Sequence, residues 1–233
     1  MATEKKYKLT DECITFDDRK LYRIEALKDF GWVRKGDKGG FIESEKNLSH
    51  NGDCWVFGDA VVYGNAEICN NAAVFGNARV WGNAAVFGNA AVCGNARVWG
   101  NAAGFGNAAV CGNAEVWGNA AVCGNAEVWG NAAVWGNAEV WGNAAVGGNA
   151  EVCGNAEVGG TAKVINNADY IVFKNWWSSG RYFTWTRSNN MWRVGCFYGT
   201  GEELIAKAYK DSELSGREYE RVVKYVESIV KED

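Results

Sequence analysis

The chain has 233 residues, no proline and a formal net charge of −4. This length allows one large domain or two small ones, and the negative charge excludes the basic surface by which proteins bind duplex DNA or anionic membranes. No apolar run is long enough to cross a bilayer, and residues 1–12 lack the apolar segment of a secretory signal. We therefore expect a cytoplasmic protein that binds neither duplex DNA nor a membrane.

Residues 1–40 form a segment of their own, because they follow no regular period. YKL, CITF and KLYRIEAL predict short strands, and the segment ends in the glycine-rich stretch KGDKGG. It carries 10 basic and 8 acidic residues, whereas residues 41–170 carry 4 basic and 11 acidic. Since a repeat structure needs covered ends, this segment is expected to be an N-terminal cap.

A six-residue repeat then dominates the chain. Every sixth residue from Ala60 to Ala168 is alanine, at 19 successive positions without an insertion. Valine or isoleucine follows two residues later, with Gly104 and Tyr170 as exceptions. Side chains two apart on a strand point the same way, and Gly-Asn accepts unusual backbone angles, so each hexad predicts one short strand and one corner.

The hexads resemble the hexapeptide repeat of left-handed parallel β-helices, in which three hexads make one triangular coil of 18 residues. The resemblance implies a mainly β fold with alanine and valine inside, glycine at the corners and asparagine ladders along the edges. We expect about seven coils over residues 41–170, with the inward frame reaching back through Cys54, Leu48 and Ile42. Gly104 takes a valine slot, so its coil should hold a small void.

The outward position after each valine forms three columns along the solenoid, and one is aromatic over five coils. It consists of Tyr63, Trp81, Trp99, Trp117 and Trp135, and Arg79 and Arg97 lie beside it on the same strands. Stacked rings can brace a sheet without any partner. An exposed aromatic strip is also a sign of an interface, and it then favours a homo-oligomer or a bound partner.

The eight cysteines contain no C-x-x-C pair, and five of them share one phase of the hexad. This spacing favours free thiols that fill an outward slot over disulfides or a metal site. We therefore expect neither a metal nor a cofactor.

Residues 171–233 predict a small α+β domain with a β-hairpin and two helices. IVFKNWW, RYFTWTR and MWRVGCFY are typical of strands, Thr200 and Glu203 form a capping box, and GREYERVVKYVESIV has a helical apolar stripe. Tryptophans alternate with arginines here, which favours either a buried core with a polar face or a clamp for a base and its phosphates. The candidate binding residues of this segment are Trp176, Trp177, Arg181, Trp185, Arg187, Trp192 and Arg193.

Both ends of the chain carry further motifs: YKLTDE, LYRIEALKDFG and KGDKGGFIE before the hexads, and GTGEELI after them. Together with the GNA hexads they make the chain similar to a group of bacteriophage and prophage proteins with β-helical hexad repeats. The resemblance implies a phage or prophage origin in the cytoplasm of a bacterial host. It also implies a role against host defence, by binding a defence protein or sequestering a nucleotide signal.

Three functions compete at this stage. The first is a non-enzymatic binding protein whose rigid solenoid presents a face to a host protein, a nucleotide-type small molecule or a second copy. The second is an acyltransferase, since hexapeptide β-helices often are; these enzymes use a histidine base and a loop extruded from the coils. His50 is the single histidine, and the hexads leave no room for such a loop. The third is a structural phage component. We expect the first, with no catalytic residue.

Overall fold

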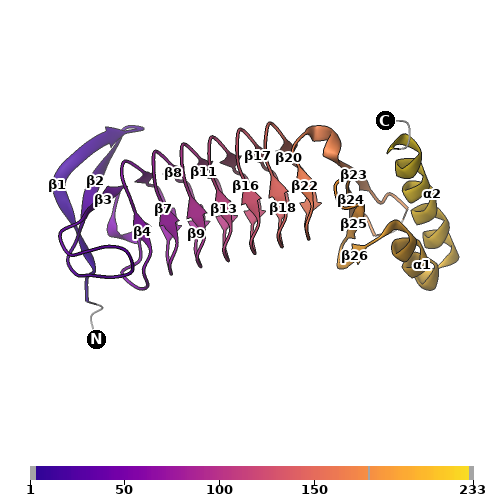
Figure 1. Ribbon diagram of the computed structural model, residues 1–233, viewed down its shortest axis with the longest axis horizontal. Helices are drawn as coiled ribbons and strands as arrows, with labels where there is room; N and C mark the ends of the chain where they lie inside the picture. Colours follow the sequence, from indigo (N-terminus) through magenta and orange to yellow (C-terminus); the bar gives the residue numbers. More distant parts are fainter. Residues whose placement is uncertain (1–3, 178, 231–233) are drawn as a thin grey trace.

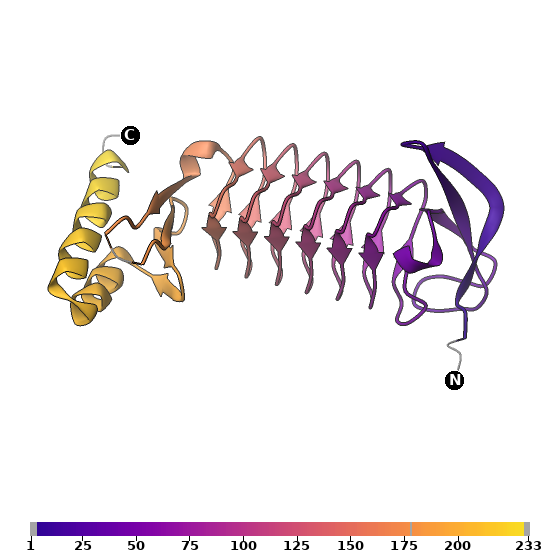
Figure 2. The same cartoon turned by 180° about the vertical axis from the view of Figure 1, so that it is seen from behind.

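The computed structural model describes residues 4–177 and 179–230. Figure 1 shows three parts along one axis: an N-terminal cap, a long parallel β-solenoid and a C-terminal unit of strands and helices. The view from behind in Figure 2 shows that the cap and the C-terminal unit lie at opposite ends of the solenoid. The predicted fold class, a parallel β-solenoid of about seven turns with 18-residue spacing, is confirmed.

Three parallel sheets form the sides of the solenoid, and each coil gives one two-residue strand to each sheet. The first, called the A face here, contains β5 (Val61–Val62), β8 (Arg79–Val80), β11 (Arg97–Val98), β14 (Glu115–Val116), β17 (Ala133–Val134) and β20 (Glu151–Val152). The second contains β4 (Trp55–Val56), β7 (Ala73–Val74), β10 (Ala91–Val92), β13 (Ala109–Val110), β16 (Glu127–Val128), β19 (Ala145–Val146) and β22 (Lys163–Val164). The third contains β6 (Glu67–Ile68), β9 (Ala85–Val86), β12 (Ala103–Gly104), β15 (Ala121–Val122), β18 (Glu139–Val140) and β21 (Glu157–Val158).

The repeat builds the coils as its residue types predict. The frame alanines from Ala60 to Ala162 and the valines that follow them are buried, so they fill the narrow interior. Corner glycines such as Gly82 have φ near +74°. Glycine adopts this conformation without steric strain, whereas residues with a Cβ atom rarely do. The corner asparagines from Asn65 to Asn137 donate their side-chain amides to the asparagine 18 residues on, as Asn101 does to Asn119 at 2.9 Å. The expected asparagine ladders are therefore present.

The first coil departs from the predicted frame by two residues. Ile42 of β3 (Lys38–Ile42) pairs with Val62, and Leu48 bridges to Ile68, so both take a valine slot instead of an alanine slot. The 3₁₀ turn η1 (Glu45–Asn47) and the irregular stretch around Asn51 lie in this coil, and the 18-residue spacing begins with β4. The prediction that Leu48 and Ile42 occupy alanine positions of the repeat is therefore wrong. Both side chains are nevertheless buried, as predicted.

Gly104 leaves the expected void in the core. An apolar cavity of about 10 Å³ lies beside it, lined by valines and alanines of the adjoining coils. A Cβ atom placed on Gly104 would meet no atom within 4 Å. The missing valine is thus not replaced by a neighbour.

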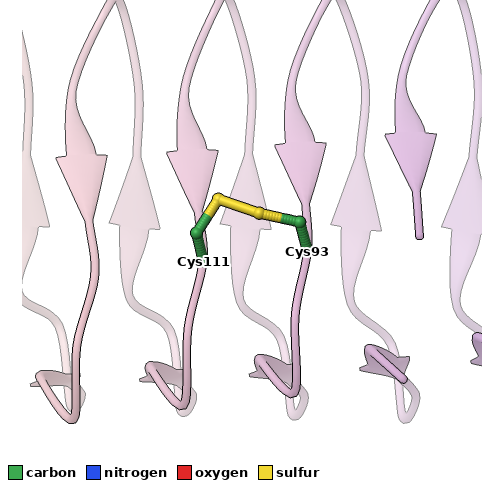
Figure 3. The surroundings of a disulfide bond; sticks show 2 residues. All are labelled: Cys93 and Cys111. Atoms are coloured by element: carbon green, nitrogen blue, oxygen red, sulfur yellow. A yellow bond between two sulfur atoms is a disulfide. The ribbon is translucent and has the colours of Figure 1, made fainter. Parts of the chain in front are cut away.

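Two cysteines contradict the expectation of free thiols. Cys93 and Cys111 form a disulfide between neighbouring coils, with their Cα atoms 4.6 Å apart (Figure 3). They follow the paired strands β10 and β13, so the parallel register brings the same outward position of both coils together. The other six cysteines are free.

The N-terminal cap closes one end of the core. A hairpin of β1 (Tyr7–Phe16) and β2 (Arg19–Ala26) continues the A face through β3. The buried ammonium group of Lys6 donates to the carbonyls of Gly52 and Cys54 at 3.0 and 2.8 Å, and burial lowers its pKa. The Tyr7 hydroxyl donates to the Leu48 carbonyl at 2.7 Å. These donors satisfy carbonyls of the open coil end.

The C-terminal unit has a four-stranded antiparallel sheet where a single hairpin was expected. Its strands are β23 (Tyr170–Lys174), β24 (Tyr182–Thr186), β25 (Met191–Val194) and β26 (Phe197–Gly199), preceded by the turn η2 (Asn167–Asp169). Helices α1 (Gly201–Asp211) and α2 (Glu213–Val230) follow, and α1 has the predicted Thr200–Glu203 capping box.

This unit covers the last coils through specific contacts. The amide of Glu157 donates to the Thr184 hydroxyl at 2.9 Å, and the Tyr198 hydroxyl donates to the Gly159 carbonyl at 3.2 Å. Among residues 4–177 and 179–230, no helix is long and apolar enough to cross a membrane.

Candidate binding surface

The aromatic column of the A face forms one continuous stack. We call Tyr63, Trp81, Trp99, Trp117 and Trp135 the aromatic ladder. Its ring centroids are 5.8 Å apart at the first step and 4.9–5.0 Å apart at the next three, with planes within 6° of parallel. Because this spacing equals the distance between strands, each ring covers the face of the next ring.

The cap closes the first end of the aromatic ladder. Phe16 meets the Tyr63 ring edge-on at a centroid distance of 5.7 Å. The Tyr63 hydroxyl donates to Asp17 at 2.8 Å, and burial together with this bond raises the pKa of Tyr63. Glu43 occupies the A-face position one coil before Tyr63, where its carboxylate accepts the Gly64 amide at 2.6 Å and pairs with Arg19 at 2.9 Å. None of these four contacts was predicted from the sequence, because they depend on how the hairpin folds over the first coil.

The other end of the ladder meets smaller groups. Cys153 takes the next A-face position after Trp135, and its Sγ lies 4.0 Å from the Tyr170 hydroxyl. That hydroxyl also donates to the Glu151 carbonyl at 2.8 Å. The pKa of Tyr170 is raised to about 12, mainly by burial and secondly by the neighbouring Cys153.

The four indoles present their edges, and not their faces, to the outside. Trp81, Trp99, Trp117 and Trp135 are half-buried. Their Nε1 atoms are neither buried nor bonded to any residue in the described parts of the chain. The result is a row of indole N–H donors on rings whose centroids lie 4.9–5.0 Å apart. Bases and sugars stack on ring faces, so this row is unsuited to a nucleotide.

Charged side chains border the ladder unevenly. Arg97 pairs with Glu115 at 3.0 Å, and both side chains keep a third or more of their surface exposed, so this pair adds little stability. The guanidinium of Arg79 lies 4.8 Å from the Phe16 ring centroid and thus belongs to the cap contact. The border therefore alternates in sign near the middle of the ladder.

The tryptophans and arginines of the C-terminal segment do not come together as a clamp. Trp185 and Trp192 face each other across β24 and β25 and are 3% and 2% exposed. Trp177 packs on Phe183 and Tyr219 in the same core. Because neighbouring strand positions face opposite ways, Arg193 points to the solenoid, where it pairs with Glu157 and lies over the Trp141 ring.

The remaining candidates of this segment are dispersed. Arg181 lines a hollow beside Glu139 and Asn155 at the last coils. Arg187 borders a groove next to α2, and Trp176 is 82% exposed. The structure thus brings Trp185, Trp192 and Arg187 to one groove and places Trp176 and Arg181 elsewhere.

His50 has no ring nitrogen directed to an open site. Its ring stacks on Tyr7 at a centroid distance of 4.3 Å, and its Nδ1 accepts the Lys6 amide at 3.3 Å. Its Nε2 is buried and lies 3.5 Å from the Glu45 carboxylate. A general base needs a nitrogen within hydrogen-bond reach of its substrate, so this geometry assigns His50 to the cap. Within the described residues, no group of three or more His, Cys, Asp or Glu side chains could hold a metal ion.

Comparison with known proteins gives limited information. No family model matches the chain. An uncharacterized acetyltransferase of Escherichia coli K12, YdcK, is 33% identical over 76 residues, which is 29% of this chain. The match covers 23% of that relative's length, so the activity in its name is for this chain only a proposal.

This comparison supports a hexapeptide-type solenoid and corrects one expectation. The sequence analysis expected no enzyme, but the named relative is an acetyltransferase and points towards one. The expectation of a non-enzyme is therefore withdrawn. The phage origin and the role against host defence stay predictions.

Proposed function

We propose that the protein is a rigid binding scaffold that holds a protein partner along the aromatic ladder, and that the partner is a second copy of the chain. The observation that carries this proposal is the row of half-exposed indole edges whose N–H groups have no partner in the described parts of the chain. Tryptophan dominates the strongest contacts of protein interfaces, because it buries much area and also donates a hydrogen bond.

The period of the ladder favours a second solenoid over other partners. Indoles whose ring centroids repeat every 4.9–5.0 Å match groups that repeat at the strand spacing of a parallel stack. A second solenoid carries this spacing along its whole length, whereas sheets of globular proteins usually have only about four to six strands. An antiparallel copy centred between Trp99 and Trp117 would place Arg97 of each copy beside Glu115 of the other, which is the self-complementary arrangement of a two-fold interface.

The test replaces Trp99 and Trp117 by serine and measures the mass by light scattering. The matched control replaces Phe87 and Phe105, which stack at 5.2 Å on a different face, by serine. In dilute protein, where the ends of the rod do not associate, we expect the ladder variant to fall to the monomer mass with unchanged circular dichroism, and the control to keep the mass of the parent protein at the same concentration. If both variants keep that mass and the parent captures no protein, the ladder is an internal brace and the proposal fails.

The parent protein could instead capture a host protein, and the ladder variant alone could lose this capture. The ladder would then still be the binding surface, but its partner would be the host protein and not a second copy. This outcome would support the role against host defence that the phage resemblance implies. It would contradict the choice of a second copy.

Acyl transfer is the second candidate, and the acetyltransferase relative favours it. The test is release of coenzyme A from acetyl-coenzyme A with a panel of amine and hydroxyl acceptors, in the parent and in His50→Asn. Activity that is lost in His50→Asn would identify His50 as the base and would require its ring to leave Tyr7. Activity that is kept would assign the reaction to another group.

A further inference from the structure

One tryptophan of the cap is almost completely exposed on a rigid turn. Trp32 keeps 92% of its surface accessible, whereas its neighbour Val33 is 2% exposed. The turn is closed by two backbone hydrogen bonds between Phe30 and Val33, at 3.0 and 2.8 Å. Gly31 has φ +47° at its bend.

The base of this turn is fixed to the cap. Phe30 packs edge-on against the buried Trp55 at a centroid distance of 5.4 Å. The Asp29 carboxylate accepts the Lys35 amide at 2.8 Å, and the Asp37 carboxylate accepts the Arg34 amide at 2.7 Å. The backbone that carries this exposed indole is fixed before any contact, so binding has to order only the side chain, as in a preorganised anchor.

A groove that could receive an indole lies on the C-terminal unit. Its volume is about 290 Å³. It is lined by the buried Trp185 and Trp192 and by Val226 and Val230 of α2. This size is near the lower limit of roughly 300 Å³ for pockets that bind small molecules, so the groove fits one ring system and little more.

The charges around the two features are complementary. The side chains of Arg34 and Lys35 follow Trp32 and have no carboxylate partner among the described residues. Glu227 stands at the rim of the groove and has no cationic partner there. Arg187 also borders the groove, but its own interaction already engages it.

We infer that Trp32 of one copy inserts into the groove formed by Trp185, Trp192, Val226 and Val230 of the next copy. The turn lies on the cap and the groove on the C-terminal unit, at opposite ends of the rod (Figures 1 and 2). Such a head-to-tail contact joins two different surfaces, so it produces an open series of copies, or a ring where the rotation between copies closes. It is independent of the proposed function, which concerns the side of the rod.

Two variants separate the two halves of this contact. Trp32→Ser removes the indole and leaves the groove. Val230→Arg blocks the groove with a long cation that also repels Arg34 and Lys35, and it leaves the turn. The matched control is Trp176→Ser, because Trp176 is 82% exposed but lies on neither feature.

The experiment is sedimentation velocity over a range of protein concentrations, in the Trp99→Ser, Trp117→Ser background so that contacts through the ladder are removed. We expect the Trp99→Ser, Trp117→Ser background, with or without the Trp176→Ser control change, to form species larger than a dimer as the concentration rises. Trp32→Ser and Val230→Arg should each stay monomeric alone. Mixed, they should form dimers and nothing larger, since the mixture has one intact indole for one intact groove.

The inference would be overturned if Trp32→Ser formed the same large species as the background protein. It would also be overturned if the Trp99→Ser, Trp117→Ser background were monomeric at every concentration. Binding of Trp32 to anionic lipid vesicles, with no association between copies, would replace the second copy by a membrane and would equally overturn it. Circular dichroism of Val230→Arg establishes that the variant is folded. Failure of the ladder proposal would leave these outcomes unchanged, because Trp99 and Trp117, the two central tryptophans of the ladder, are replaced in every sample.

Discussion

Glycine has three separate tasks in this chain at the scale of single residues. At the corners it supplies positive φ, as at Gly82 with +74°. At Gly147 and Gly159 it leaves room for an indole, since a Cβ atom there would lie 2.3 and 1.9 Å from the rings of Trp129 and Trp141. At Gly104 it leaves a valine slot empty. The sequence shows a tryptophan 18 residues before each of these two glycines. It does not show that the indole ring extends along the solenoid axis over the glycine of the next coil.

The cavity at Gly104 predicts a stabilising substitution. Gly104→Val should raise the free energy of unfolding by about 1 kcal/mol, because buried methyl groups fill the void and the backbone of the unfolded chain becomes less free. Gly104→Ala should raise it by less. Urea denaturation followed by tryptophan fluorescence measures both. A lower midpoint for the valine variant would show that the coil has closed around the glycine.

Tyr7 predicts a pH dependence. Burial raises the pKa of its hydroxyl above the ordinary value near 10, so the bond to Leu48 stabilises the fold fully below pH ~10 and is lost as pH rises above it. Tyr7→Phe should therefore lower the free energy of unfolding by about 1–2 kcal/mol at neutral pH and by less at pH ~11. Urea denaturation at the two pH values measures the difference. A constant difference would assign the loss to packing instead of the hydroxyl.

The hexad determines the elements almost completely where it is uninterrupted. Period, inward positions, corners and amide ladders follow from Ala, Val, Gly and Asn, because each position of the hexad has one role in a coil of constant size. The slip at Ile42 and Leu48 could not be predicted, since it arises from the turn η1. The Cys93–Cys111 pair was visible as neighbours in one column, but the rule for reduced cytosolic thiols argued against a bond.

The disulfide predicts a redox-dependent stability at the scale of the coil. It closes a loop with a sequence separation of 18, for which chain entropy gives about 3 kcal/mol. Reduction should lower the free energy of unfolding by about that amount. The circular dichroism should not change, because the hydrogen bond from the Cys93 amide to the Val110 carbonyl still joins the two coils.

Denaturation with and without dithiothreitol, in the parent and in Cys93→Ser, measures this effect. The control variant Cys123→Ser carries the change at a free cysteine and should keep the full response to the reductant. A thiol titration of the unreduced, denatured parent should find six thiols. Eight would show that the bond is absent.

At the scale of the whole molecule, the fold is a rod with different ends (Figure 1). The aromatic ladder runs along one of its sides. The sequence predicted which side this is, because the column could be read at intervals of 18 residues. It could not predict that the rings show their edges, which follows from stacking at the strand spacing. Trp32 and Glu43 escaped notice, because exposure and contacts of a non-repeating cap depend on its tertiary fold.

The most direct test of the ladder as a binding surface is hydrogen exchange of its indole N–H groups, followed by NMR of the protein labelled at tryptophan nitrogen. Single Trp→Phe variants assign the signals of Trp81, Trp99, Trp117 and Trp135. If the ladder docks a second copy, these four groups exchange rapidly in dilute protein and become protected as concentration rises, while Trp32 remains fast until the ends also associate. Ladder groups that stay equally fast at every concentration, under conditions where light scattering reports a dimer, would contradict the account.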